Sequence, residues 1–172
     1  MRMIVHDLEQ SVWNNIGVTI NKGDEVISDN GTIENCMECD RCWTDSQGVC
    51  VKQDGYRCVG PFFSECSQLV LISRCVYGGF SPFIQNVIER CRTQLLPRLQ
   101  MRHSQTHYAL RSSNRNKYGL ICCFYGDNIT AEEEETARML SIADGISLQA
   151  AGVKIMFFDG IEELGCVKEV LG

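Results

Sequence analysis

The sequence predicts a three-layer α/β fold built on a central parallel sheet. Three uninterrupted apolar runs of strand length lie at residues 67–73, 118–125 and 152–159. Stretches with helical patterning separate them, and continuously apolar strands are typical of parallel sheets that helices cover on both faces. The 172 residues suffice for one domain with its own core, so we expect a single domain over residues 1–172.

The N-terminal third supplies the first two expected strands. Residues 1–8 form a strand around the apolar centre Met3, Ile4 and Val5. Residues 9–32 are weakly patterned, with room for one short helical turn at 12–15 and a strand near 24–28. A cysteine-rich segment, residues 35–58, then precedes the third expected strand at 67–73.

Two helices follow the apolar strands. Ser81 as N-cap and Pro82 in the first helical position open one helix. Its apolar positions recur at helical spacing and Pro97 is expected to end it. We interpret the polar and basic residues 100–117 as a long loop. Thr130 is the expected N-cap of a second helix, whose first turn carries the acids at 132–135 and so complements the helix dipole.

Composition and charge exclude several function classes. The chain is 44% hydrophobic and 22% charged, with a net charge of −6, which gives no electrostatic support for nucleic-acid or anionic-membrane binding. No apolar run is long enough to span a bilayer, and the first ten residues do not read as a signal peptide. We therefore expect a cytoplasmic protein.

Eleven cysteines are the compositional outlier. Their odd number and irregular spacing favour reduced thiols over a disulfide framework. Seven are scattered and are expected to act mostly as small core residues: Cys58, Cys66, Cys75, Cys91, Cys122, Cys123 and Cys166.

The other four cysteines are grouped as C-x2-C-x2-C-x7-C, at Cys36, Cys39, Cys42 and Cys50. Thiolates at this spacing can converge on an iron–sulfur cluster, and tetrahedral zinc also accepts four thiolates. The alternative is that the thiols only pack, or that a former cluster site has lapsed. The spacing favours a [4Fe-4S] cluster over zinc.

From residue 35 to residue 159 the chain resembles the NADPH-dependent FMN reductase-like branch of the flavodoxin superfamily, and more narrowly the iron–sulfur flavoproteins. The segment NCMECDRCWTDSQGVCVKQD matches the compact cysteine motif of that group. The segment SQLVLISRCVYGGFSPFIQNVIERC matches its third strand, the following loop and the next helix. The resemblance implies a flavodoxin-like sheet of order 2-1-3-4-5, with the cysteine-rich insertion before the third strand.

The resemblance also implies cofactors and site residues. FMN would be bound noncovalently, with NAD(P)H or a redox protein partner supplying electrons. The loop after the third strand would lie along the flavin ring, with Tyr77 as a stacking or edge contact, and the loop at 125–128 would contact its other side. The implied cofactor-binding residues are Ser73, Arg74, Cys75, Val76, Tyr77, Gly78, Gly79, Tyr125 and Gly126.

Two positions depart from the family pattern. The first strand runs into EQSVWNNIG without the glycine-rich phosphate loop, and Asp7 and Glu9 would repel a phosphate dianion. Arg74 stands where proline is usual, and it could add a cation for a phosphate. The missing phosphate loop counts against FMN.

Several residues have competing interpretations. Cys75 is either redox-active at the flavin edge or a buried, inert thiol. His103 and His107, with Arg111, could recognise an anion or cap a partner's site, and otherwise they are solvated loop residues. Without the family resemblance, Tyr77 and Tyr125 would be half-buried aromatic side chains. No arrangement typical of a hydrolase is present.

The sequence thus favours a flavin-dependent electron-transfer oxidoreductase of the NAD(P)H:FMN reductase or iron–sulfur flavoprotein kind. A homodimer or higher homo-oligomer is expected, with electrons crossing a subunit interface. The alternative is a flavodoxin-like domain that has lost its phosphate loop and serves as a non-enzymatic binding or assembly subunit. A structural zinc module is a third possibility.

Overall fold

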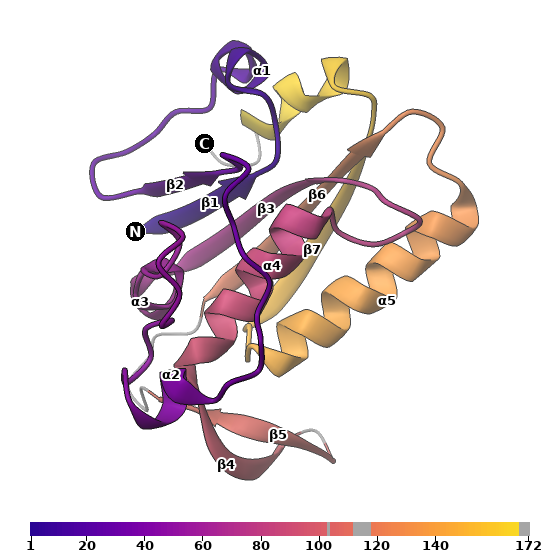
Figure 1. Ribbon diagram of the computed structural model, residues 1–172. Coiled ribbons are helices and arrows are strands. Elements are labelled where there is room, and N and C mark those ends of the chain that lie inside the picture. Colours follow the sequence, from indigo (N-terminus) through magenta and orange to yellow (C-terminus); the bar gives the residue numbers. More distant parts are fainter. Residues whose placement is uncertain (103, 112–117, 169–172) are drawn as a thin grey trace.

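The computed structural model describes residues 1–102, 104–111 and 118–168. A five-stranded parallel sheet of order β2-β1-β3-β6-β7 runs through its centre (Figure 1). This confirms the predicted fold class, because the parallel strands taken in chain order read 2-1-3-4-5. The strands are β1 (Arg2–His6), β2 (Glu25–Ser28), β3 (Gln68–Arg74), β6 (Gly119–Gly126) and β7 (Gly152–Asp159).

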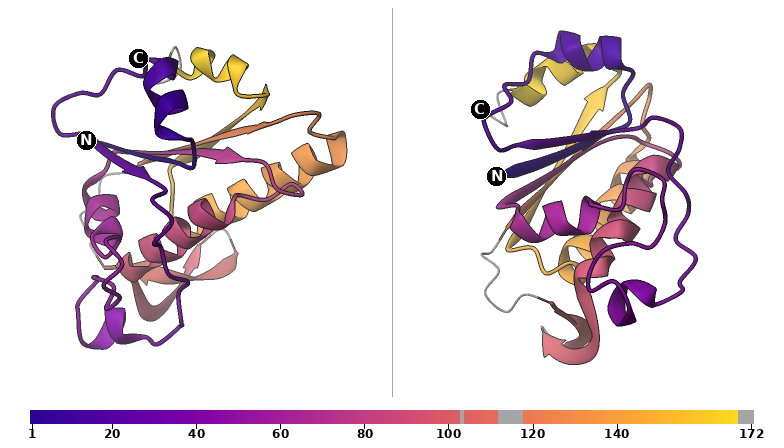
Figure 2. Two further views of the ribbon diagram at one scale, coloured as in Figure 1. Left: turned by 45° about the horizontal axis from the view of Figure 1, so that its top comes forward. Right: turned by 60° about the vertical axis from the view of Figure 1, so that its left-hand side comes forward.

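Helices cover both faces of the sheet, as Figure 2 shows. One face carries α1 (Gln10–Ile16) and the 3₁₀ turn η2 (Glu162–Cys166). The other carries α3 (Val59–Glu65), α4 (Pro82–Cys91) and α5 (Ala131–Ser147). The resulting three layers bury the central strands on both sides.

Two cores follow from the alternation of side chains along the strands. In β3, Leu69 and Leu71 point toward α3 and α4, whereas Val70 and Ile72 point toward α1 and η2. All four side chains are buried, which explains why the strand is continuously apolar. Burying each side chain of this size contributes about 1.5 to 3 kcal/mol.

Both predicted helix starts are confirmed. The hydroxyl of Ser81 accepts a hydrogen bond from the backbone N–H of Ile84, with Pro82 at the first position of α4. Thr130 and Glu133 form a reciprocal capping box at the start of α5. These caps satisfy N–H groups that a helix leaves without partners in its first turn.

The expected long loop at 100–117 is wrong over its described part. Helix α4 ends at Cys91, earlier than expected, and is followed by the 3₁₀ turn η1 (Arg92–Gln94). The chain then forms an antiparallel hairpin of β4 (Leu95–Arg102) and β5 (Gln105–Leu110). Pro97 lies in β4 at an irregularity of the pairing between Leu96 and Leu99, where a strand tolerates proline.

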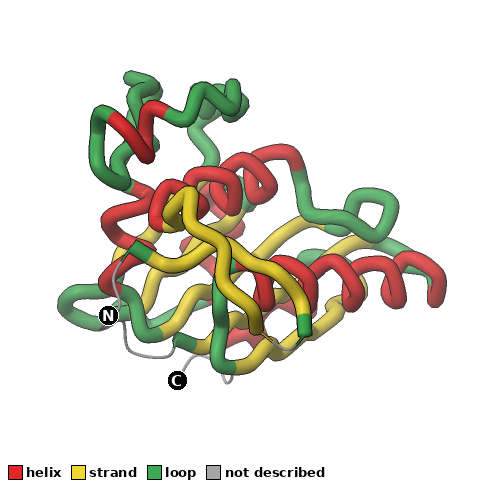
Figure 3. The backbone as a smooth tube through the Cα atoms, turned by 90° about the horizontal axis from the view of Figure 1, so that it is seen from below, coloured by secondary structure: helices red, strands yellow, loops and turns green. Residues whose placement is uncertain are grey.

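This hairpin forms a second, separate sheet. Viewed from below, its two strands lie in front of the helices (Figure 3). The cysteine-rich segment precedes β3 and contains only one short helix, α2 (Arg41–Thr44), which packs against β4. Trp43 of this helix contacts Tyr108 of β5, with ring centroids 5.4 Å apart. Within the described residues, no helix is long and apolar enough to cross a membrane.

Candidate functional site

The carboxyl ends of β1, β3 and β6 meet where the strand order reverses. Strand β1 is followed along the chain by β2 on one side, whereas β3 lies on its other side. Open α/β sheets bind ligands at this switch point, in the crevice outside the carboxyl ends of the strands. The predicted loops after Ser73 and Tyr125 both lie at this edge, because Arg74 is paired with Tyr125 in register.

The loop that follows β3 is a tight, internally hydrogen-bonded turn. Val76 and Gly79 exchange both of their backbone hydrogen bonds, at 3.0 and 2.8 Å. Between them, Tyr77 and Gly78 have φ angles of 50° and 77°. Two successive residues with positive φ are typical of a type I′ turn, a conformation that is unusual for a bulky aromatic residue.

Gly78 presses this turn against α5. A Cβ at Gly78 would lie 2.7 Å from Cβ of Thr136 and 2.9 Å from the carbonyl oxygen of Glu133, so only glycine fits. The opposite side of the turn projects Tyr77 into solvent, where its side chain is 91% exposed. Tyr77 is therefore not the half-buried aromatic expected from the sequence. The turn holds its ring away from the protein, where it can contact a ligand.

Ser73 and Cys75 anchor the base of the same loop. The buried Ser73 hydroxyl accepts a hydrogen bond from the N–H of Ser81 at 2.8 Å and donates to the Arg74 carbonyl. Cys75 is half-buried, and its N–H donates to the Tyr125 carbonyl at 2.8 Å. Burial raises the pKa of the Cys75 thiol, and the nearby Glu133 adds to the rise. A protonated thiol at neutral pH agrees with the inert interpretation of Cys75.

Asp7 occupies the switch point itself. Its Oδ2 accepts the backbone N–H of Arg74 at 2.9 Å, and its Oδ1 accepts the hydroxyl of Tyr125 at 2.9 Å. Tyr125 is buried, contrary to the half-buried expectation, and burial together with the Asp7 carboxylate raises the pKa of its phenol. The carboxylate thus joins β1, β3 and β6 at the point where a ligand would enter.

The fit of this edge to FMN differs between its two ends. The turn at 76–79 and Gly126 offer backbone and an aromatic ring to a flavin ring system. On the phosphate side, three residues join β1 to α1, glycine is absent from residues 7–16, and α1 has only seven residues. The Asp7 carboxylate lies where the phosphate would need positive charge or N–H donors. The residues present therefore do not fit a phosphate dianion.

The edge is acidic beyond Asp7. A shallow cavity of about 290 Å³ lies at the ends of β6 and β7, and Glu134, Asp159 and Glu163 contribute to its lining. Asn128 and Asp159 are linked there by a backbone N–H to carboxylate hydrogen bond of 3.4 Å. Glu134 is paired with Arg138, so Asp159 and Glu163 carry the negative charge that disfavours anionic ligands on this side of the edge.

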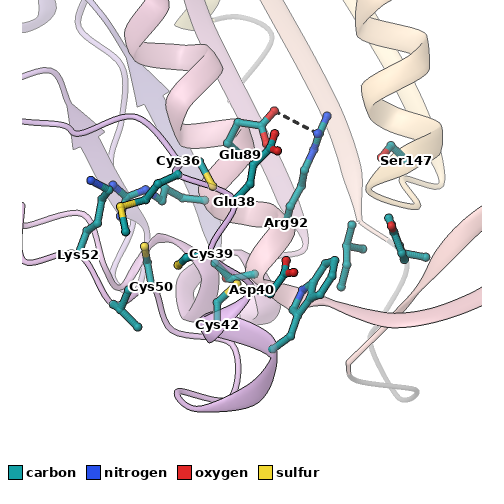
Figure 4. A pocket seen from close by; sticks show the side chains of 17 residues that line it. Cys36, Glu38, Cys39, Asp40, Cys42, Cys50, Lys52, Glu89, Arg92 and Ser147 are labelled. Carbon is teal, nitrogen blue, oxygen red and sulfur yellow. Dashed lines mark ion pairs between the residues drawn. The ribbon is translucent and has the colours of Figure 1, made fainter.

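The four grouped cysteines line one pocket at the opposite end of the molecule. This pocket has a volume of about 470 Å³, and Figure 4 shows Cys36, Cys39, Cys42 and Cys50 on one side of it. Its other walls come from the last turn of α4, from η1, from the hairpin and from Ser147 at the end of α5. Glu89, the first residue of α4 in this lining, lies about 10 Å along the helix from Pro82 at the carboxyl edge.

The cysteines are close enough to influence one another. Burial raises the pKa of the Cys42 thiol, and Cys50, Cys36 and Cys39 raise it further through their charges. Across the described part of the chain, however, no three His, Cys, Asp or Glu side chains are arranged so that they could hold a metal ion. The metal site at these cysteines stays a prediction that rests on the donor set.

Nitrogen donors surround the thiols. Nε1 of Trp43, Nε and Nη1 of Arg90, Nε of Arg92 and Nε of Arg111 are all buried and lack a hydrogen-bond partner among the described residues. Trp43, Arg90 and Arg92 line the pocket, and Arg111 donates from Nη2 to the carbonyl of Cys42 at 3.3 Å. Buried donors without partners are costly, and an acceptor group in the pocket would satisfy them. The charge of the pocket is mixed, because Glu38, Asp40 and Glu89 also line it and Arg90 and Arg92 are paired with acids.

A buried ion pair holds the cysteine-rich segment on α4. Arg90 and Asp54 are each 1% exposed, and Arg90 also donates to the Glu34 carbonyl at 2.8 Å. Burial alone would raise the pKa of Asp54, but N–H donors of Glu34 and Tyr56 and the charge of Arg90 lower it below its usual value. Sequence reasoning missed Arg90, whose only signal is a cation between the apolar residues Ile88 and Cys91.

Some of the remaining predicted residues have the expected burial and others do not. Cys66, Cys91, Cys122 and Cys123 are buried as expected, whereas Cys58 and Cys166 are exposed and do not belong to the core. His107 lies on β5 and is half-buried, so it is not a solvated loop residue. His103 lies outside the described residues. The side chain of Arg74 is exposed, and its backbone rather than its guanidinium contacts Asp7.

Comparisons with known proteins identify the fold. No protein-family model matches the chain, and no curated protein sequence matches it. Among solved structures, Smu.1420 from Streptococcus mutans aligns with a TM-score of 0.59 at 6% identity, covering 99% of this chain and 100% of that one. The Trp repressor binding protein from Bacillus subtilis aligns with a TM-score of 0.55 at 12% identity, covering 100% and 99%.

A third similar structure is an FMN-dependent NADH-azoreductase from Bacillus anthracis in complex with FMN. It aligns with a TM-score of 0.54 at 9% identity and covers 99% of this chain and 94% of that one. Identities this low carry information on fold alone. Together with the strand order β2-β1-β3-β6-β7, they show that this chain has a flavodoxin-like fold.

Proposed function

We propose that the protein is a flavin-dependent electron-transfer oxidoreductase that holds a flavin ring at the carboxyl edge of its sheet. The observation that carries this proposal is the type I′ turn, which is fixed on α5 by Gly78 and presents an exposed Tyr77 beside the switch point. Flavin-binding neighbours share the fold, and the B. anthracis azoreductase is one whose structure contains FMN. A bound flavin would supply one- or two-electron chemistry.

The chain's own residues would position the ring. The turn at 76–79 would meet the ring mainly through Tyr77, because the N–H groups of Cys75, Val76 and Gly79 already donate within the protein. Tyr77 would stack on it or contact its edge, and Tyr125 and Gly126 would border it from the neighbouring strand. We assign no side chain a role as acid or base.

We further propose that Cys36, Cys39, Cys42 and Cys50 hold a [4Fe-4S] cluster. Four thiolates are the donor set that such clusters take, and the cluster carries negative charge. The buried N–H groups of Trp43, Arg90 and Arg92 would offset part of that charge, which the acids of the same lining, Glu38, Asp40 and Glu89, oppose. Zinc would use the same four thiolates, so metal analysis has to separate the two.

The electron donor is NAD(P)H or a redox protein. The acids that line the cavity at β6 and β7 disfavour a polyanionic dinucleotide there, so the charge pattern supports a protein donor with a basic surface. The two sites lie at opposite ends of α4, about 10 Å apart or more along the helix, and transfer between them is expected to cross between subunits.

A homodimer would cover an exposed apolar face. Met139 and Ile142 of α5 are 58% and 47% exposed, and with His107 of β5 they line a groove of about 410 Å³. Exposed apolar surface of this kind is typical of interaction sites. Light scattering of the wild type and of Ile142→Glu tests it: the wild type should be a dimer and the variant a monomer.

Anaerobic purification with quantified iron, sulfide and flavin tests the proposal directly. We expect flavin and about four irons per chain. Cys42→Ser and Cys50→Ser should lose the iron, whereas the matched variant Cys58→Ser, which removes an exposed cysteine outside the pocket, should retain it. One zinc per chain in place of iron would support the structural zinc module.

A second candidate function is favoured by the Asp7 contacts at the switch point. A flavodoxin-like domain that is closed to phosphate could serve as a non-enzymatic binding or assembly subunit. The absence of both flavin and iron after reconstitution would contradict the oxidoreductase proposal and support this one.

A further inference from the structure

The carboxylate of Asp7 takes the place that a phosphate group would need at the switch point. It accepts one backbone N–H, from Arg74, and one hydroxyl, from Tyr125, each at 2.9 Å. Backbone N–H groups and hydroxyls are donors that proteins commonly use for phosphate oxygens. Here both donors are already engaged by an anion that belongs to the chain.

The surroundings offer little else to a phosphate. Helix α1 begins after Glu9, whose side chain caps no N–H group, and the helix is too short to concentrate a dipole. Arg74 is the nearby cation, and its charge acts on the Tyr125 phenol. Asp7 and Glu9 thus bring two carboxylates to the start of α1, and these would repel a phosphate.

The ring side of the same edge has no such obstacle. Tyr77 is exposed, and the turn that carries it is held by its own hydrogen bonds and by α5, without a contribution from Asp7. The carboxyl edge therefore has a surface for a flavin ring at the Tyr77 turn, but Asp7 blocks the place for the phosphate.

We propose that Asp7 is a specificity-determining residue that rejects phosphorylated flavin, so that the protein binds a flavin without a phosphate, of the riboflavin type, in preference to FMN. This inference rests on the proposed flavin function. It narrows the ligand from flavins in general to those that bring no dianion to the switch point.

Titration of the full chain with riboflavin and with FMN, followed by quenching of flavin fluorescence, tests the proposal. We expect wild type to bind riboflavin at least about tenfold more tightly than FMN, because like charges a few ångströms apart repel strongly. Asp7→Asn keeps the shape and removes the charge, so FMN affinity should rise by about tenfold or more while riboflavin affinity stays within about twofold.

Two controls accompany this titration. Glu65→Gln removes one exposed acid at the amino end of β3 and should leave the ratio of the two affinities unchanged. Asp7→Ser, which also removes the charge but keeps a hydrogen-bond acceptor, should reproduce the gain in FMN affinity if Asp7→Asn fails to fold. In wild type alone, raising the salt concentration should strengthen FMN binding and leave riboflavin binding unchanged, since salt screens the repulsion.

The outcomes separate this inference from the proposed function. Equal binding of FMN and riboflavin to wild type, with no change in Asp7→Asn, would overturn the role of Asp7 and leave the flavin function standing. Binding of neither flavin to wild type, Asp7→Asn or Asp7→Ser would overturn both. Preference for riboflavin that disappears in Asp7→Asn but not in Glu65→Gln would support both.

Discussion

The two ends of α4 satisfy their polar groups in opposite ways. At the carboxyl edge, the Tyr125 hydroxyl and the Arg74 N–H both donate to the Asp7 carboxylate. At the cysteine pocket, buried donors of Trp43 and Arg90 lack partners among the described residues. The comparison teaches that the donors at the carboxyl edge are closed to an outside anion, whereas the inserted segment leaves buried N–H groups beside its cysteines open to an acceptor.

The largest expected effect comes from breaking the ion pair beneath the cysteine pocket. Arg90→Met leaves the Asp54 carboxylate buried without its cation and should lower the free energy of unfolding by about 3 to 5 kcal/mol. The matched variant Arg41→Met removes an exposed pair with Asp45 in the same segment and should cost less than about 1 kcal/mol. Urea denaturation measures both, and equal costs would refute the idea that this pair holds the segment.

As the pH falls, protonation of His6 should lower the stability of the protein at a higher pH than protonation of the carboxylates does. Burial lowers the pKa of His6 to about 4, and neither ring nitrogen has a hydrogen-bond partner among the described residues. The unfolded chain therefore binds a proton below about pH 6.5 that the folded chain does not, so stability falls between pH 6.5 and 4, by up to about 3 kcal/mol.

His6→Phe tests this pH dependence. The imidazole stacks on Trp13 with ring centroids 4.1 Å apart, and a phenyl ring can stack in the same way. In urea denaturation at pH 7 and at pH 4.5, wild type should lose stability and the variant should lose distinctly less. An identical loss in the two proteins would assign the acid sensitivity to other groups.

An alanine at Gly78 should loosen the turn at the carboxyl edge. The added Cβ would meet Thr136 and the Glu133 carbonyl, so Gly78→Ala should cost about 2 kcal/mol or more from overpacking and positive φ together. Gly31 has a similar φ of 74° but open space around it, and Gly31→Ala should cost only about 1 kcal/mol. A larger loss at Gly31 in thermal or urea denaturation would contradict the close contact with α5.

The smallest effect on stability, and the sharpest on binding, is expected at Tyr77. Asparagine favours the positive φ of a type I′ turn, so Tyr77→Asn should raise the free energy of unfolding by up to about 0.5 kcal/mol. The same change removes the exposed ring and should weaken flavin binding by about tenfold. Lower stability combined with unchanged flavin affinity would show that Tyr77 serves the fold rather than a ligand.

Sequence patterns predicted the parallel sheet because a strand that is buried on both faces has a continuously apolar sequence. Leu69 and Val70 face different helical layers, and both must be apolar. The caps at Ser81 and Thr130 were equally predictable, since a side-chain oxygen before a helix satisfies its free N–H groups locally. Local rules of this kind need no knowledge of distant contacts.

The hairpin β4–β5 was missed because its strands are not buried on both faces. Its strands pair with each other and not with the parallel sheet, and side chains such as Leu99 and Met101 remain exposed. Polar and apolar side chains do alternate at residues 98–102, but this run is short and its apolar members are not buried. Pairing, rather than burial, makes these residues a sheet.

The candidate site was predictable in its membership but not in its spatial arrangement. The spacing of the four cysteines indicated one cluster, and they do line one pocket. The distance of that pocket from Tyr77, the contacts of Asp7 with two other strands, and the burial of Arg90 all depend on the packing of segments far apart in the sequence. No local pattern encodes them.

The placement of the two added pieces has a consequence for how this fold can change over time. The cysteine-rich segment follows β2 in the chain and the hairpin follows α4. Neither therefore interrupts the pairing of the five parallel strands. Either piece can lengthen, shorten or exchange its residues without shifting the register of a single strand pair. Descendants of this chain can thus exchange the cysteines while inheriting the sheet and its Tyr77 turn, provided that the buried pair of Asp54 and Arg90 is kept or replaced as a unit.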